Sequence, residues 1–323
     1  MTERHPLIGY FLSCEEYGVE ELIEQAVLAE EAGFEALWIS DHYHPWNDEQ
    51  GESAFVWSLI GALSRVVRLP VTTAVTCPTV RTHPAVVAQA AATSHVLLDG
   101  RFRFGVGTGE ALNEHILGDP WPPEKVRLEM LEEAVEVIRE LWKGEAVQHH
   151  GRHYTVENAR IYTRRDDPPP IYVSAFGPRA AEVACRIGDG LITMSPDSEV
   201  VDIFKDTGAG KPLAGGYKVA WAETEDEGVG HAHRLWANAG LPGELAQVLP
   251  SPQHFAQASS LVTEESTRES TVCGPDVERH VDAFRPYLDA GFDEIYVANM
   301  GPHYADMIRT YGEKVLPAVR RGR

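Results

Sequence analysis

The sequence lacks long apolar runs, and no stretch approaches the ~18 consecutive apolar residues of a membrane helix. Its first residues, Met1-Thr2-Glu3-Arg4-His5-Pro6, also lack the apolar core of a signal peptide. Cysteine is scarce, and no two cysteines form a C-x-x-C pair: the four are Cys14, Cys77, Cys185 and Cys273. These absences predict a reduced, cytoplasmic protein without a membrane span.

Basic residues are also few, with 28 Lys and Arg against 49 Asp and Glu and a formal net charge of -21. Such a chain repels phosphate backbones and anionic lipids, which argues against nucleic-acid or membrane binding as a main role. The 323 residues, 43% of them hydrophobic, suffice for one large core or two domains. Low-complexity segments and domain linkers are not evident.

Short apolar segments alternate with stretches of helical period along the chain. Strands are predicted at 7–12, 34–40, 69–75, 101–107, 171–175, 190–193, 217–221 and 292–297. Helices are predicted at 19–32, 54–67, 83–98, 122–142, 178–187, 228–239, 275–290 and 304–319. This alternation favours an α/β fold, a TIM-like (β/α)8 barrel, over an open doubly wound sheet.

Two stretches interrupt the alternation and are predicted to be insertions into a single barrel domain of residues 1–323. The first, near 146–167, alternates around Gly151 and indicates a hairpin. The second, near 241–271, is non-periodic and contains several prolines.

A glycine-rich turn follows the predicted fourth strand, in the run from Phe102 to Glu114. Gly105, Gly107 and Gly109 remove side chains from one face of the backbone, which leaves room for a flat ring or a phosphate. The turn then supplies a carboxylate, Glu110, and an amide, Asn113, at the carboxyl end of a strand, where chemistry is placed in parallel α/β folds. The spacing is not the G-x-G-x-x-G of a dinucleotide fold. Close strand–helix packing beside a solvated glutamate is the alternative interpretation.

The predicted second strand ends in Ser40-Asp41-His42-Tyr43-His44-Pro45-Trp46, a cluster suited to acid–base chemistry. His42 titrates near neutrality and can exchange a proton with a substrate hydroxyl. Asp41 points to the other side of an extended chain, so it need not orient the His42 ring. A loop histidine beside a solvated aspartate is the alternative.

Three other features carry weaker signals. Cys77 has no adjacent base and is predicted to be a packed residue rather than a nucleophile. Gly177-Pro178 begins a helix whose N-terminus, with Arg179, could bind phosphate, although ordinary helix initiation explains the pattern equally well. His149, His150 and His153 match no standard metal spacing, so no metal site is predicted.

Together these motifs resemble the F420-dependent glucose-6-phosphate dehydrogenase group of the luciferase-like superfamily. The resemblance rests on Ser40 to Trp46, Pro78 to Arg81 and Gly105 to Glu114. It continues through Arg127-Leu128, 141–144, 187–190 and 290–292, and so covers nearly the whole chain.

The resemblance implies a TIM-like barrel that binds coenzyme F420 at its carboxyl face. It implies that His42 handles the substrate proton and that Trp46 lies beside the reacting centre. It also implies that Glu110 handles the proton associated with the reduced deazaflavin ring. It also implies a non-proline cis peptide near Ala74-Val75. The implied coenzyme-binding positions are Asp41, Val75, Cys77, Gly107, Thr108, Asn113, Phe176, Gly177 and Arg179, with Cys77 in place of a threonine and Phe176 in place of a glycine.

The sequence departs from this family at the implied substrate site. Where the family has a threonine and a lysine after strand six, this chain has Met194-Ser195-Pro196-Asp197. An aspartate in place of a phosphate-binding lysine turns attraction into repulsion, which argues against glucose 6-phosphate as the substrate. Met194, Asp197 and Arg268 are therefore the candidate substrate-binding residues.

The resulting expectation is an F420-dependent oxidoreductase that transfers a hydride between an alcohol or sugar-type small molecule and C5 of the deazaflavin. An FMN-dependent monooxygenase of the luciferase type is the alternative on the same fold. A non-catalytic F420 carrier and a sugar-phosphate isomerase barrel also stay open. Apolar residues on the first helices fit a homodimer, although they would serve a core equally well.

Overall fold

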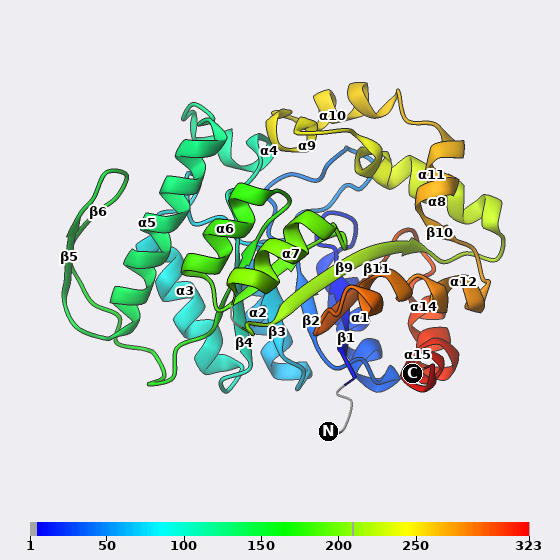
Figure 1. The fold of residues 1–323 in the computed structure, drawn as a ribbon, viewed down its shortest axis with the longest axis horizontal. Helices are drawn as coiled ribbons and strands as arrows, with labels where there is room; N and C mark the ends of the chain where they lie inside the picture. The colour runs from blue at the N-terminus through cyan, green and yellow to red at the C-terminus, as the bar shows by residue number, and fades with distance from the viewer. Residues whose placement is uncertain (1–4, 209, 323) are drawn as a thin grey trace.

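The computed structural model describes residues 5–208 and 210–322. Within these residues, eight parallel strands follow one another around a closed barrel, since β9 pairs with both β8 and β11 (Figure 1). The TIM-like (β/α)8 prediction is therefore confirmed. In barrel order the strands are β11 (Glu294–Asn299), β1 (Leu7–Leu12), β2 (Leu37–Ile39), β3 (Val71–Thr73), β4 (Phe102–Val106), β7 (Ile171–Ser174), β8 (Gly190–Thr193) and β9 (Leu213–Ala220).

Amphipathic helices surround the barrel and bury their apolar sides against the strands. α1 shows why such helices form: Leu22, Ala26 and Ala29 are buried at helical spacing, and Gly33 ends the helix with a left-handed φ of 90°. The surrounding helices include α1 (Val19–Ala32), α2 (Val56–Val66), α3 (Pro84–Leu97), α5 (Glu124–Trp142), α6 (Pro178–Ile187), α7 (Ser198–Thr207), α8 (Glu225–Trp236), α12 (Val277–Asp282), α13 (Arg285–Asp289), α14 (Tyr304–Thr310) and α15 (Leu316–Arg321).

The structure departs most from the predicted helices at three places. α7 was not predicted; Asp197 caps it by accepting hydrogen bonds from the backbone N–H groups of Glu199 and Val200. The predicted helix at 275–290 is split into α12 and α13, and Pro286 lies in the first turn of α13, where its missing N–H costs nothing. The predicted helix at 304–319 contains a π-helical turn, Tyr311–Val315, between α14 and α15.

The barrel interior is filled by stacked aromatic rings. Trp38 and Tyr296 lie with ring centroids 4.1 Å apart and planes 11° apart. Glycine makes room for them, because a Cβ on Gly9 would lie 2.2 Å from the Tyr296 ring and one on Gly216 would lie 2.6 Å from the Trp38 ring. At the amino end of β11, Glu294 accepts hydrogen bonds from Arg103 and from the hydroxyl groups of Tyr172 and Tyr296.

The two irregular stretches of sequence take different forms. β5 (Val147–His150) and β6 (Thr155–Ala159) form an antiparallel hairpin that extends beside α5, as the sequence predicted for this region (Figure 1). The segment at 241–271 is more regular than predicted, with α9 (Leu245–Val248), α10 (Pro252–Ser259) and α11 (Glu264–Ser270). This segment leads into β10 (Val272–Cys273), which pairs with the end of β9.

Among the described helices, none has both the length and the apolar character required to cross a membrane. Residues 1–4 of the stretch considered for a signal peptide lie outside the described residues.

Replacing Gly9 by alanine should destabilise the barrel, because the added methyl group would collide with the buried Tyr296 ring. We expect the free energy of unfolding, measured by urea titration, to fall by about 1–3 kcal/mol. Gly61→Ala in α2 is the matched control, since a Cβ there meets no atom within 4 Å. Because alanine has a higher helix propensity than glycine, the free energy of unfolding of that variant should stay unchanged or rise by up to about 1 kcal/mol. Equal stability of the two variants would contradict the packing argument.

Candidate active site

The side-chain amide of Asn113 connects the loops that follow β2 and β4. Its oxygen accepts hydrogen bonds from the backbone N–H groups of Tyr43 (2.9 Å) and His44 (3.1 Å). This orientation turns the amide nitrogen toward His42 Nδ1, 3.1 Å away, and toward Glu110 Oε2, 3.4 Å away. The structure therefore brings the predicted proton-handling residues His42 and Glu110 to one buried amide, in α4 (Ala111–Glu114).

The His42 ring has a partner for each protonation state of its two nitrogens. When Nδ1 is bare it can accept from Asn113, and when protonated it can donate to the carbonyl of His44 at 3.3 Å. Nε2 lies 3.4 Å from the carboxylate of Glu15, which stabilises the imidazolium form. The ring of Trp46 lies 4.9 Å from that of His42 and 5.0 Å from that of Phe255 in α10.

Two charged residues near His42 were not predicted from the sequence, the buried Glu15 and the partly buried Lys218. Glu15 follows β1 and accepts a hydrogen bond from Ser40 (2.7 Å). Lys218 on β9 donates to Ser13 (3.1 Å), and its ammonium lies 3.4 Å from the centre of the Trp236 ring. The strand-end rule that found His42 applies equally to Glu15, whereas Lys218 lies within a strand of otherwise small and apolar residues.

Burial and charge pairing oppose each other at these two groups. Burial would raise the pKa of Glu15, but His42 and Lys218 hold it below its ordinary value. Burial lowers the pKa of Lys218 to about 8, against the opposing effect of Glu15 and Glu16. Each charge therefore depends on its neighbours to remain ionised inside the protein.

Asp41 lies in a second buried charge cluster. Its carboxylate accepts hydrogen bonds from Thr76 (2.7 Å) and from the guanidinium of Arg81 (3.0 Å). The backbone N–H of Arg81 donates to Glu114 (2.7 Å). Burial raises the pKa of Glu114 to about 7, although the adjacent Arg81 acts in the opposite direction. Asp41 is thus held within the protein, and its contact with a coenzyme remains a prediction.

The glycine-rich turn allows close packing against the end of β3. A Cβ on Gly105 would lie 1.8 Å from the carbonyl oxygen of Thr73, and one on Gly107 would lie 2.7 Å from Val75. The Ala74-Val75 peptide is cis, as the family resemblance implied. Close packing is therefore one function of these glycines, and a ring lying against Gly107 and Thr108 remains a prediction.

Cys77 is buried beside Glu114 and Glu110. Burial raises the pKa of the Cys77 thiol well above its ordinary value, and these two acidic neighbours raise it further. A protonated thiol is a poor nucleophile, which agrees with the packed role predicted for this residue.

The turn after β7 offers an N-terminus for an anion. Gly177 caps α6 without a side-chain hydrogen bond, and its Cα faces space in which a Cβ would meet no atom within 4 Å. Phe176 beside it is 59% exposed, and Arg179 pairs with Glu124 at 3.0 Å. Free backbone N–H groups at a helix N-terminus are suited to a phosphate.

The candidate substrate-binding residues are already engaged in the protein. Met194 accepts a hydrogen bond through its carbonyl from Tyr287 (3.1 Å), and Asp197 caps α7. Arg268 in α11 pairs with Asp226 (2.8 Å) and lies 3.6 Å from Glu225, both in α8. Their roles in substrate binding remain predictions.

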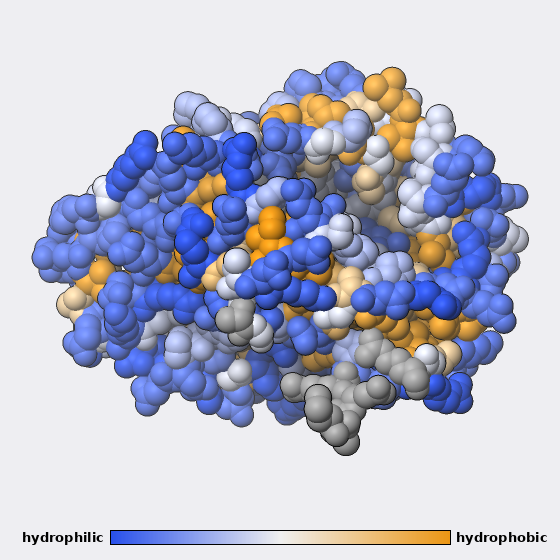
Figure 2. Space-filling view, in the orientation of Figure 1, coloured by the Kyte–Doolittle hydropathy of each residue, from blue (hydrophilic) through white to orange (hydrophobic). Residues whose placement is uncertain are grey.

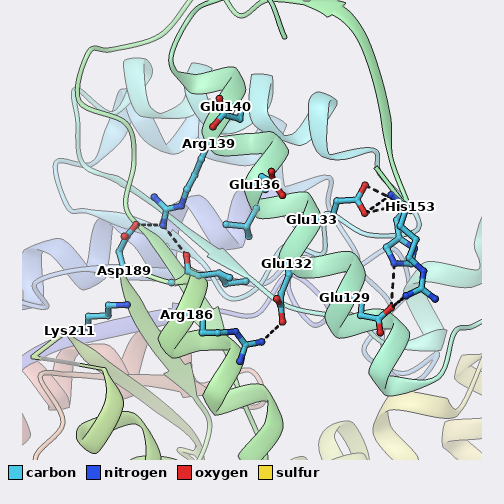
Figure 3. Close-up of a pocket in the computed structure, with 14 residues that line it drawn as sticks. Glu129, Glu132, Glu133, Glu136, Arg139, Glu140, His153, Arg186, Asp189 and Lys211 are labelled. Atoms are coloured by element: carbon cyan, nitrogen blue, oxygen red, sulfur yellow. Dashed lines mark hydrogen bonds and ion pairs between the residues drawn. The ribbon is translucent and has the colours of Figure 1, made fainter. Parts of the chain in front are cut away.

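A charged groove lies on the flank of the barrel, between α5 and α6 (Figure 3). It contains none of the predicted site residues. Its arginines are neutralised by ion pairs, which join Arg139 to Asp189, Arg152 to Glu129 and Arg186 to Glu132. Apolar side chains instead gather on the segment that contains α9 and α10, at the top of Figure 2, where Leu245, Val248 and Leu261 are exposed.

Comparisons with known proteins identify relatives over nearly the whole chain. The family described as luciferase-like monooxygenase matches residues 8–294. An F420-dependent glucose-6-phosphate dehydrogenase of Nakamurella multipartita is 37% identical, over 99% of this chain and 98% of that protein. One from Kribbella flavida is 36% identical, over 97% of this chain and 98% of that protein.

Solved structures extend the comparison. An F420-dependent secondary alcohol dehydrogenase in complex with an F420-acetone adduct superposes with a TM-score of 0.90 at 31% identity, covering 98% of this chain and 99% of the other. A coenzyme F420-dependent tetrahydromethanopterin reductase from Methanopyrus kandleri has a TM-score of 0.78 at 20% identity, covering 98% and 99%, and shares the fold. The resemblance inferred from the motifs is confirmed by these relatives.

Glu114→Gln should change how stability depends on pH. The folded protein holds a proton on Glu114 up to about pH 7, whereas the ordinary pKa is 4.5. Stability from the protonated form is therefore present at low pH and lost as the pH rises through about 7. Between about pH 4 and about pH 8, wild type should lose about 3 kcal/mol relative to Glu114→Gln.

Urea unfolding at a series of pH values measures this difference. Glu31→Gln, at an exposed position of α1, should show a constant difference from wild type over the same range. A constant difference for Glu114→Gln as well would show that Glu114 does not titrate abnormally.

Proposed function

This chain belongs to the luciferase-like monooxygenase family. Within that family, we propose that it is a coenzyme F420-dependent oxidoreductase that acts on a small alcohol. Full-length relatives at 33–37% identity carry the name F420-dependent glucose-6-phosphate dehydrogenase, which supports the coenzyme. The observation that carries the proposal is the Asn113 amide, which holds an imidazole and a carboxylate at the carboxyl face of the barrel. Redox transfer at an alcohol carbon needs such groups to move the accompanying protons.

The residues present fit the coenzyme. F420 has a flat deazaflavin ring and an anionic tail that contains a phosphate. The N-terminus of α6, where the N-cap Gly177 makes no side-chain hydrogen bond, is suited to that phosphate, and the exposed ring of Phe176 offers an apolar surface beside it. Thr108, Val75 and Gly107 at the carboxyl ends of β3 and β4 would border the ring.

When bound, the coenzyme supplies a carbon, C5, that accepts or returns a hydride. In the oxidising direction, the His42 tautomer with a proton on Nδ1 takes the substrate hydroxyl proton at Nε2. In this tautomer Nδ1–H donates to the carbonyl of His44, and the hydrogen bond that Asn113 gives to a bare Nδ1 is absent. Glu15 then stabilises the imidazolium across 3.4 Å. Glu110 holds the proton that accompanies reduction of the coenzyme, and Trp46 excludes water from the His42 ring.

The charges around His42 favour an uncharged substrate. Lys218 is bonded to Ser13 and flanked by Glu15 and Glu16, so its charge is already balanced. Arg81 is paired with Asp41 and Glu114, and Arg268 with residues of α8. A phosphate at this site would have to compete with these carboxylates for every one of these cations.

Purified protein should bind F420 with a dissociation constant of roughly micromolar or below, followed by coenzyme fluorescence. Neutral secondary alcohols should then reduce the coenzyme with a kcat/KM at least about tenfold above that of glucose 6-phosphate, because charge repulsion weakens binding of the phosphate. Failure to bind F420 would overturn the function. Protein purified with bound yellow flavin would instead favour the FMN-dependent alternative.

His42→Ala should lower kcat with the preferred alcohol by about 100-fold or more while F420 affinity stays within about threefold, since the imidazole acts on the substrate proton. His150→Ala on the β5–β6 hairpin is the control and should leave turnover unchanged. If F420 binds but wild type and His42→Ala turn over no substrate alike, the protein is a carrier. Undiminished turnover in His42→Ala would refute the proton role.

The proposal includes a homodimer in the cytoplasm. Exposed apolar residues on the neighbouring helices α2 and α3, namely Val66, Val86, Val96 and Leu97, support a subunit contact. The four cysteines are free thiols, which supports a reducing compartment. Light scattering coupled to gel filtration measures the subunit number directly.

A further inference from the structure

A histidine–glutamate cluster lies outside the residues assigned to the redox site. Glu227 and His231 are one turn apart on α8, and His303 lies at the start of α14 (right side of Figure 1). The Nε2 atoms of both imidazoles face the same carboxylate oxygen, Glu227 Oε1, at 3.7 Å for His231 and 3.2 Å for His303. One ligand atom from each residue lies within 4.8 Å of the other two.

These separations suit a tetrahedral metal ion. Zinc binds imidazole nitrogen and carboxylate oxygen at about 2.0–2.2 Å, which places neighbouring ligand atoms about 3.3–3.5 Å apart. The observed 3.2 and 3.7 Å span that value, so small side-chain rotations would complete the three-ligand set. Two histidines and one glutamate are a donor set that zinc uses when its fourth position holds water.

The cluster is arranged in advance for such an ion. Glu227 Oε2 accepts a hydrogen bond from the backbone N–H of Glu223 (3.1 Å), which leaves Oε1 facing the histidines. The Nε2 atom of His231 is buried and has no hydrogen-bond partner among the described residues. A nitrogen in that position needs a ligand to replace its lost hydration.

Neighbouring groups support the same arrangement. A carboxylate also lies on the outer side of the His303 ring: Asp306 is 3.9 Å from Nδ1, within ion-pair range but beyond a hydrogen bond.

We propose that Glu227, His231 and His303 form a binding site for a divalent transition-metal ion of the zinc class, with water at the fourth position. Imidazole ligands select zinc-class ions over Mg²⁺ and Ca²⁺, which prefer oxygen. The side chains are 38%, 21% and 26% exposed, respectively, so the ion has access from solvent.

Such an ion would join two neighbouring βα units at the carboxyl face. Gly301, between β11 and His303, lies against the His231 ring, and its carbonyl accepts a hydrogen bond from Tyr17 (2.7 Å) in the loop after β1. The ion would therefore fix α8 to the β11–α14 connection and, through Gly301, to the loop that carries Glu15. Its expected effect is on stability, because it would link segments that separate on unfolding.

The test uses the full chain without an affinity tag, stripped of metal by chelator dialysis and titrated with Zn²⁺ by calorimetry. We expect one Zn²⁺ per chain at this site, a rise in the midpoint of thermal unfolding, and no rise with Mg²⁺. Co²⁺ in its place should give the visible absorption of a tetrahedral ion with nitrogen and oxygen ligands.

His231→Ala and His303→Ala should each weaken Zn²⁺ binding by at least about tenfold. Glu227→Gln keeps the side-chain volume and should also weaken binding, which protects the test if an alanine variant folds poorly. His150→Ala is the matched control, because His150 forms a His–carboxylate pair with Glu157 (3.1 Å) without a third ligand among residues 5–208 and 210–322. Zinc binding that survives all three cluster substitutions, or a midpoint raised equally by Mg²⁺, would overturn the proposal.

Discussion

The arrangement of the candidate active site depends on one buried amide. The side-chain oxygen of Asn113 accepts two hydrogen bonds from the loop after β2, and its side-chain nitrogen faces His42 and Glu110. Because an amide cannot exchange its oxygen and nitrogen without losing these partners, the imidazole and the carboxylate are held at fixed positions relative to each other. The barrel supplies this geometry: β2 and β4 are separated by one strand, so their carboxyl ends lie close enough for a single side chain to span them.

Charge is balanced locally in a chain that is strongly acidic as a whole. Glu15 and Glu16 face Lys218, and Asp41 and Glu114 face Arg81. A nearby cation favours the charged form of a buried carboxylate, whereas burial favours the neutral form. At Glu114 burial outweighs the adjacent Arg81 and raises the pKa to about 7. Lys218 and Arg81 are thereby engaged by carboxylates of the protein itself.

Sequence reasoning succeeded where a local signal decides the structure. The bounds of β1, α1, α6 and β8 were predicted to the residue, because glycine ends α1, Gly177-Pro178 begins α6, and apolar runs mark the strands. It failed where tertiary packing decides. β9 begins at Leu213, ahead of the predicted 217, because Gly215 and Gly216, which usually weaken a strand, serve here to admit the rings of Phe292 and Trp38. His42, Glu110 and Asn113 could be found as strand-end residues, whereas the surroundings of Lys218 and the burial of Glu114 depend on distant segments.

The stacked rings of Trp38 and Tyr296 and the Arg103–Glu294 pair fill the barrel below His42. Any molecule that reaches the imidazole therefore arrives from the carboxyl side, past the segment that contains Phe255. Under the proposed function, coenzyme and alcohol would both enter from this face. The filled barrel would then favour ordered kinetics, in which the partner bound deeper arrives first and leaves last.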